Sequence, residues 1–349
     1  MGATSISSAY LASCLVLPVV QAQSQLAEAT TEESTGVWAD IGAELGEQSG
    51  YELSLKEQID QLNVQTTANS ITATSLSNAQ AALTTISSSA STTAQALTEW
   101  TANSSATTNL KTIGEQALAG LVSSANTASG GAYVFGGINT STAPMTDYSS
   151  TSAFTAQFDA DFKAAFGCLP SDAAAADIAA AQMQSFLGGT FASYFSGSNW
   201  SNWSSASSTN TTASIAPGQI ATTSTNANTT GFKDLTQGYA MLALFGGSSL
   251  GSSAMQAVVS AATTLVTAGQ SAITGAAAAL GQTQSQVTDA NGAMSSQLTL
   301  IQTQVNALDE PNQTALSAKI TALTNQIQMA YELTNRLHAL NLAQYLPVS

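Results

Sequence analysis

The chain has 349 residues, of which 44% are hydrophobic and only 8% are charged. Six basic residues stand against 21 acidic ones, which gives a net charge of −15. Nucleic acids and anionic membranes are bound by clustered Lys and Arg, so this balance argues against both as partners. The two cysteines, Cys14 and Cys168, lie in unlike settings and are predicted to be free thiols rather than a disulfide.

The first predicted element is a short apolar helix at the N-terminus. Residues 9–20 form an apolar run that is too short to span a bilayer, so no membrane insertion is expected. The run has the length of a signal-peptide core, with cleavage before Gln23, although no Lys or Arg precedes it. The favoured alternative is an amphipathic helix that is interrupted at Pro18. Its stripe consists of Ile6, Tyr10, Cys14 and Leu17.

Acidic residues are concentrated between residues 28 and 60, where Lys56 is the only base. A calcium-binding loop would need Asp or Asn at alternate positions around a glycine, and no such loop accompanies them. We therefore predict a solvated acidic face and no ion site.

Two long helical spans follow from the positions of the prolines, because proline interrupts a helix. Residues 19–143 and 218–310 contain none. In the first span, apolar residues recur at helical spacing from Leu55 to Leu121, which predicts one very long helix or two in succession. In the second span, a similar stripe runs from Met255 to Leu308.

A segment of different composition separates these spans. All ten phenylalanines lie between Phe135 and Phe245, so this segment is predicted to build a compact α+β domain. Phenylalanines at every fourth position from 154 to 166 predict one helix, and Ala173 to Leu187 a second that ends at Gly188-Gly189. Residues 196–230 are rich in Ser, Thr and Asn, which is typical of short strands and loops.

The last predicted element is a narrow apolar helix after Pro311. Its apolar residues average slightly under 3.5 residues apart, and they are Leu316, Ile320, Leu323, Ile327, Ala330, Leu333, Leu337 and Leu340. Such a stripe is too long and narrow to be covered by a compact globule, so we interpret it as an assembly surface. Its predicted partners are the N-terminal stripe around Ile6 and Tyr10 and the same helices of neighbouring copies.

The predicted fold class is mainly α: long antiparallel helical rods, with a terminal coiled coil, and a smaller inserted α+β domain. The expected segments are an N-terminal assembly helix (1–45), first rod helices (46–130), the inserted domain (131–239), return rod helices (240–310) and a C-terminal assembly helix (311–349).

The sequence offers little for catalysis or metal binding. The one histidine, His338, falls in the terminal helix, where no cleft is indicated. Neither CxxC nor HExxH occurs. Gly130-Gly131 and Gly136-Gly137 mark a turn leading into a strand and not a phosphate cradle. We predict no enzyme activity, no cofactor and no metal.

The stretch Asn199 to Ser204, with sequence NWSNWS, allows three interpretations. It contains glycosylation sequons, and its two tryptophans could form a sugar-stacking platform. Tryptophans three residues apart more often share a core or an edge, and this interpretation is favoured.

Two stretches resemble a known family. Gly131 to Thr140, with sequence GAYVFGGINT, followed by Ala143-Pro144-Met145, resembles the point where proteins of the flagellin family leave their first rod. Gln328 to Leu337 and Leu342 to Leu346 are similar to the family's terminal helix and its closing aromatic–Leu pair. The resemblance is greatest to the hook–filament junction branch found in alphaproteobacteria. Two departures from the family pattern, Thr35 to Gly42 in place of the usual basic turn and Pro18 in a helix that is ordinarily continuous, favour a junction protein over a filament subunit.

The resemblance implies a structural component of the bacterial flagellum, outside the cell, that joins hook to filament. It implies export by the flagellar type III apparatus with an export chaperone and without a cleaved signal peptide. The implied partners are copies of the chain itself, the first hook–filament junction protein and flagellin. The expected assembly interface consists of Ile6, Tyr10, Leu17, Leu316, Ile320, Leu323, Ile327, Leu333, Leu337, Leu340, Leu342, Tyr345 and Leu346. Two alternatives stay open: a flagellin, and a secreted Ser/Thr/Asn-rich surface adhesin.

Overall fold

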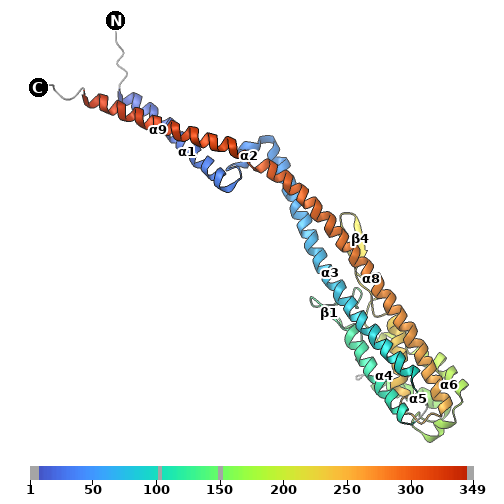
Figure 1. Cartoon of the computed structure of the whole chain (residues 1–349). Helices are drawn as coiled ribbons and strands as arrows, with labels where there is room; N and C mark the ends of the chain where they lie inside the picture. The colour runs from blue at the N-terminus through green and yellow to red at the C-terminus, as the bar shows by residue number, and fades with distance from the viewer. Residues whose placement is uncertain (1–7, 101–103, 148–151, 344–349) are drawn as a thin grey trace. The chain divides into compact units, whose positions relative to one another are not determined.

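A computed structural model describes residues 8–100, 104–147 and 152–343. These residues are mainly helical, as predicted (Figure 1). The long helices are α1 Ser8–Thr35, α3 Ser49–Thr98, α4 Ser104–Ala125, α7 Thr230–Phe245, α8 Ser252–Asp309 and α9 Gln313–Ala343. The shorter helices are α2 Ile41–Leu45, α5 Ser152–Phe166 and α6 Ala180–Phe186. Two antiparallel hairpins pair β1 Ala128–Ser129 with β2 Ala132–Tyr133, and β3 Thr212–Ala216 with β4 Gln219–Thr222.

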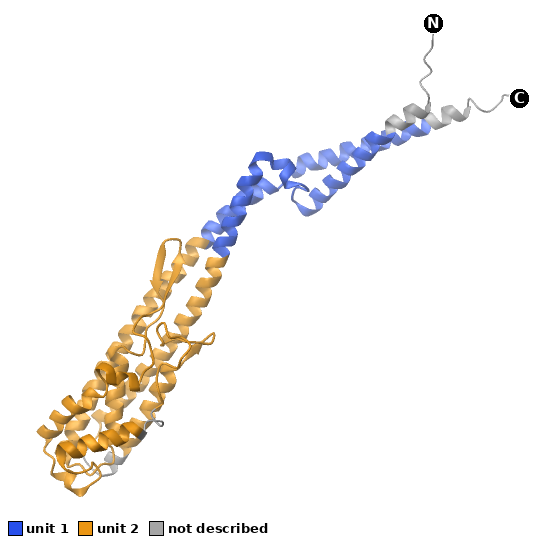
Figure 2. Ribbon diagram, turned by 180° about the vertical axis from the view of Figure 1, so that it is seen from behind, with its two compact units in different colours: residues 1–63, 295–349 blue, residues 64–294 orange. Residues whose placement is uncertain are grey.

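The chain divides into two compact units (Figure 2). Unit 1 contains residues 1–63 and 295–349, and unit 2 contains residues 64–294. The boundary falls within α3 and within α8, so each of these helices contributes to both units. The predicted division into five segments is not tested by this result and stays a prediction.

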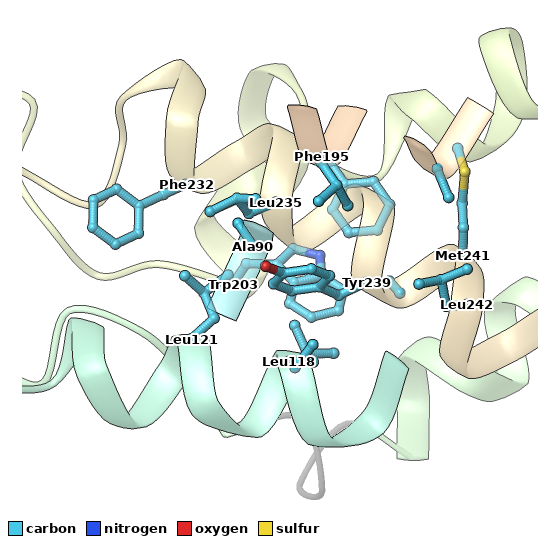
Figure 3. Packing of buried hydrophobic residues seen from close by; sticks show 14 of the residues in the cluster. Ala90, Leu118, Leu121, Phe195, Trp203, Phe232, Leu235, Tyr239, Met241 and Leu242 are labelled. Atoms are coloured by element: carbon cyan, nitrogen blue, oxygen red, sulfur yellow. The ribbon is translucent and has the colours of Figure 1, made fainter. Parts of the chain in front are cut away.

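Helix α7 is the central helix of unit 2, and most of its residues are buried. Leu118 and Leu121 on α4 point toward its side chains (Figure 3). At Gly114 the two helices come closer than side chains permit, because a Cβ built there would lie 2.4 Å from the backbone nitrogen of Ala243. The sequence places glycine where α4 and α7 touch backbone to backbone.

The phenylalanines of α5 form one helical face, as predicted. Phe158 and Phe162 are fully buried, and their rings lie 5.3 Å and 6.0 Å, centroid to centroid, from Phe245 of α7. Trp200 and Trp203 are also buried. These aromatic side chains belong to one continuous core with the buried residues of α3, α4, α7 and α8.

The predicted helix from Ala173 to Leu187 is wrong. A 3₁₀-helix covers Ala173–Asp177, the chain is extended at Ile178 and Ala179, and α6 begins at Ala180. Gly188-Gly189 does not end the segment, because the chain continues through both as a π-helix. Burial explains the break: Ile178 and Met183 both enter the core, but on a continuous helix they would point roughly 140° apart.

The predicted interruption at Pro18 is also wrong, since α1 continues through it. A proline removes one backbone hydrogen bond and bends a helix, which a helix of 28 residues can sustain. The helix ends instead at Gly36, whose φ of +75° favours glycine. The predicted turn at Gly130-Gly131 is confirmed, because both residues have positive φ and join β1 to β2.

Of the two cysteines, Cys168 is buried and free. The side chain of Cys14 lies outside the described residues.

Candidate assembly surface

Helices α1 and α9 lie side by side in unit 1 (Figure 1). The amide nitrogen Nε2 of Gln23 donates a 2.8 Å hydrogen bond to the Tyr331 hydroxyl. The Ser317 hydroxyl donates to Oε1 of Glu33 at 3.1 Å. Because later residues of α1 pair with earlier residues of α9, the two helices are antiparallel.

The contact between them is an apolar seam. On α9 its members are Leu316, Leu323 and Ile327, all buried. On α1 its members are Ala22, Leu26 and Ala29, of which Leu26 is partly exposed. Sequence reasoning missed the α1 side, although its spacing of four and three residues is the signal of a helix face. Two of these residues are alanines, which are less conspicuous than the large apolar residues nearby.

The predicted interface residues have different environments in the structure. Leu316, Leu323 and Ile327 are buried, and Ile320 is half-buried. Leu17 and Leu333 are exposed, at 66% and 46%. The backbones of Tyr10, Leu337, Leu340 and Leu342 lie in α1 and α9, but their side chains, like that of His338, are outside the described residues. Ile6, Tyr345 and Leu346 are outside the described residues altogether.

Burial along α9 follows the period of a straight helix and departs from the predicted stripe. The buried and half-buried positions from Leu316 on are 316, 320, 323, 324, 327, 330 and 334, which cover five turns in 18 residues, or 3.6 residues per turn. The predicted stripe advances more slowly and reaches Leu333 where burial has passed to Thr334. On a straight helix, adjacent residues point roughly 100° apart. Leu333 is therefore turned out of the seam.

Several apolar side chains of both helices are exposed, and we call them together the outer apolar face. On α1 they are Val16, Leu17 and Val20, each more than half exposed. On α9 they are Met329, at 63% exposed, and Leu333. Val16 and Leu17 lie four and three positions before Val20, and Met329 lies four before Leu333, so these pairs are neighbours on the surface of their helix. Large apolar residues grouped in this way mark a binding surface more often than isolated ones do.

A buried polar cluster joins the loops of unit 1. The backbone nitrogen of Trp38 donates to the carbonyl oxygen of Asp309 at 3.0 Å. The backbone nitrogen of Ala39 donates to Oε1 of Glu32 at 3.2 Å. The predicted solvated acidic face is therefore wrong in part, because Glu32 and Glu52 are buried. Each has one donor nearby, the Ala39 amide for Glu32 and the Lys56 ammonium for Glu52, which lowers the cost of leaving water. Oε2 of Glu32 is buried without a hydrogen-bond partner among the described residues.

Lys56 supplies the positive charge of this cluster. Its ammonium forms ion pairs with Glu52 and with Oδ2 of Asp309, the latter at 3.0 Å. Hydrogen bonding to Glu52 first, and to Asp309 second, raises the pKa of Lys56. Asp309 is the last residue of α8, where the helix dipole disfavours a carboxylate. Lys56 offsets this cost.

We expect Lys56→Met to destabilise unit 1 by about 1–2 kcal/mol at neutral pH, because it leaves buried carboxylates without a counter-charge. The estimate is below the value for fully buried pairs, since the Lys56 side chain is 43% exposed. Chemical denaturation measures the effect, and Lys319→Met, which removes an exposed base from α9, is the matched control.

The stability difference between wild type and Lys56→Met is expected to depend on pH. A lysine whose folded pKa is raised contributes stability that is fully present below its unfolded pKa, about 10.4, and is lost as pH rises through the higher folded pKa. The difference between wild type and Lys56→Met should therefore shrink above about pH 10.5. A difference that stayed constant from pH 7 to pH 11 would contradict the ion-pair interpretation.

Within residues 8–100, 104–147 and 152–343, no group of three or more His, Cys, Asp and Glu side chains is arranged to hold a metal ion. One helical stretch between residues 252 and 336 contains an 18-residue window that is apolar enough to cross a membrane, by length and composition alone. Of that window 39% is buried, and core helices of soluble proteins pass the same test.

Residues 6–140 match the family model of the bacterial flagellin N-terminal helical region. Comparisons with curated proteins and with solved structures give no match. The match supports a relationship of the chain to the flagellin family and a structural role in the flagellum. Members of this family are structural and non-enzymatic, and they assemble into an extracellular flagellar polymer.

Proposed function

We propose that the chain is a hook–filament junction protein of the flagellum, of the kind called hook-associated protein 3. The observation that carries an assembly role is the outer apolar face of the α1–α9 pair, which the chain itself leaves in water. The assignment to the junction rests on the resemblance of residues 131–145 and 328–346 to that branch, and on the turn at residues 35–42. In this chain that turn is held to the end of α8 through Trp38.

The outer apolar face supports binding between copies on energetic grounds. Fully burying a Val, Leu or Met side chain is worth about 1.5–3 kcal/mol relative to leaving it exposed. The five residues of this face, each 46–66% exposed, would contribute several such increments to a contact with neighbouring helices. Neighbouring copies, the first junction protein and flagellin are the proposed partners.

The proposal includes export through the flagellar type III apparatus, with an export chaperone and without cleavage. Cleavage before Gln23 would remove Ala22 and the preceding part of α1, which contains three residues of the outer apolar face. Intact-mass measurement of the secreted protein tests this point. A mature N-terminus at Gln23 would contradict it and would favour the surface-adhesin alternative.

A filament subunit is the second candidate, and the match to the flagellin N-terminal region supports it equally. Deleting the gene distinguishes the two roles. If the chain is a junction protein, the mutant keeps its hooks and sheds flagellin into the medium. If it is the filament subunit, the mutant forms no filament and sheds no flagellin into the medium. The purified chain then grows long filaments from seeds.

We expect Leu333→Asp to abolish most incorporation into the flagellum while leaving the fold intact. A charge on the outer apolar face would be desolvated without a partner on contact with another subunit, whereas in the free chain it remains in water. Incorporation is measured by immunoblotting of purified flagella, and folding by circular dichroism. Asn335→Asp adds the same charge at an exposed position of α9 and should incorporate normally. Equal incorporation of both variants would refute the proposed contact.

A further inference from the structure

Unit 2 contains a hollow of about 640 Å³ that no assembly role requires. It lies between α5 and the segment from Ser193 to Trp203. Ligand pockets in proteins typically measure about 300–1,000 Å³, so the hollow has room for a small organic molecule. Its lining combines one carboxylate, three side-chain amides, a phenol and two further aromatic rings.

Asp161 is the polar centre of the hollow. Its Oδ2 accepts a 2.5 Å hydrogen bond from the Tyr194 hydroxyl and a 2.9 Å hydrogen bond from Nε2 of Gln157. Hydrogen bonding from Gln157 first, and from Tyr194 second, lowers the pKa of Asp161. The carboxylate is therefore ionised and held in one orientation. Among the described residues its other oxygen, Oδ1, accepts no hydrogen bond.

Two asparagines line the same hollow at the start and end of one turn. Asn199 Nδ2 donates to the carbonyl oxygen of Ser193 at 3.0 Å, which fixes the amide and leaves its Oδ1 as an acceptor. Asn202, the last residue of the 3₁₀-helix Gly197–Asn202, is exposed. Its side-chain amide forms no hydrogen bond within the described part of the chain, so it offers both a donor and an acceptor.

Phe154 supplies an apolar wall. Its half-buried ring is packed edge-on against Tyr194, at 5.3 Å and 90°, and against Trp203, at 4.9 Å and 74°. These contacts fix the ring from behind, where Trp203 is fully buried. Rigid aromatic walls provide contact area at little entropic cost.

We propose that this hollow binds a neutral saccharide of one or two rings. A sugar presents vicinal hydroxyls, which both donate and accept, and apolar C–H faces. The fixed carboxylate accepts from hydroxyls, the amides of Asn199 and Asn202 complete their hydrogen bonds, and Phe154 lies where a C–H face can pack. The inference does not depend on which flagellar role the chain has.

The charges of the site select among small molecules. The only ionised group among the described lining residues is Asp161, so phosphates and acidic sugars meet a carboxylate and no base. The net charge of −15 likewise repels anionic ligands. A purely apolar ligand would leave the carboxylate and the amides without partners, which costs free energy. Uncharged polyols with an apolar face fit both conditions.

Saturation-transfer NMR on the full-length chain tests the proposal. The probes are methyl α-glucoside, methyl α-mannoside, methyl β-galactoside, N-acetylglucosamine and cellobiose, with N-acetylneuraminic acid as the acidic comparison. We expect at least one neutral sugar to bind and the acidic sugar not to bind. Binding of none of the neutral sugars, or equal binding of the acidic one, would overturn the proposal.

Three variants locate the binding site. Asp161→Asn should weaken binding of the neutral sugar at least about tenfold, or about 1.4 kcal/mol. Asn202→Ala should weaken binding of the neutral sugar several-fold. Because Asn202 is exposed, this substitution should leave folding unchanged, even if Asp161→Asn impairs folding. Asp159→Asn, on the same helix but outside the hollow, removes the same charge and should bind normally. Unchanged binding by Asn202→Ala and Asp161→Asn would show that the sugar binds elsewhere and refute this site.

Discussion

Replacing Gly114 by alanine is expected to destabilise unit 2 by about 3 kcal/mol, the upper end of what overpacking usually costs. The added methyl would lie 2.4 Å from the backbone nitrogen of Ala243 and 2.8 Å from the backbone carbon of Leu242. A flexible side chain can move away from such a contact, but helix backbone cannot do so without separating α4 from α7. The midpoint of chemical denaturation, followed by far-UV circular dichroism, measures the loss.

Gly120→Ala is the matched control for this prediction. Gly120 lies on the same helix, and a Cβ built there meets nothing within 4 Å. Replacing glycine by alanine at an exposed helical position stabilises a helix by about 1 kcal/mol. The two substitutions, chemically identical and six residues apart, should therefore move stability in opposite directions. Equal effects would mean that α4 does not pack against α7 at Gly114.

Leu323→Asp is expected to separate α1 from α9. Leu323 is 7% exposed and lies between Ala22 and Ile327 in the seam. The substitution removes a buried apolar side chain and places an unpaired carboxylate in its position, a combination that costs about 3–5 kcal/mol. The seam contains only six residues, so this loss is large relative to what holds the pair together. Hydrogen exchange of the α9 amides should rise, while exchange in unit 2 stays as in wild type.

Asn325→Asp controls for charge, since residue 325 is exposed on the same helix. It should leave exchange in α9 unchanged. Protection of α9 that survives Leu323→Asp would mean that the seam does not hold the helix in the free chain. This test differs from that of Leu333→Asp, which concerns contacts between subunits and should not alter exchange in the monomer.

The helices could be predicted from sequence because their signal is local. The stripe from Met255 to Leu308 lies in a single helix of 58 residues, and the stripe from Leu55 to Leu121 lies in two. The spacing of apolar residues is enough to predict these helices, since apolar residues three and four positions apart form one face of a helix, whichever element packs against it. The break at Ile178 does not follow from local spacing, because it depends on which residues reach the core, and that depends on the rest of unit 2.

The candidate sites were less predictable because they combine distant residues. Asp161 and Tyr194 are 33 positions apart, and nothing in their local sequence indicates that the hydroxyl reaches the carboxylate. Burial of Glu52 depends on Lys56, a neighbour in the helix, but also on Asp309 at the far end of α8. The role of Gly114 does not follow from sequence either, because a glycine within a helix does not reveal which backbone approaches it.

The difference in period between the predicted stripe and the buried seam divides the stripe into two parts, one buried in the single chain and one exposed. Near Leu316 the stripe and the seam coincide, and there the loops are anchored by Trp38 and Lys56. A single chain can close this end alone, because each residue added lies next to a contact already formed. Farther along α9 the stripe turns outward, so that Leu333 stays exposed in the single chain although the two helices remain paired. Burial of the first half of the stripe is therefore complete in the single chain, whereas burial of Leu333 would need the contact between subunits proposed above.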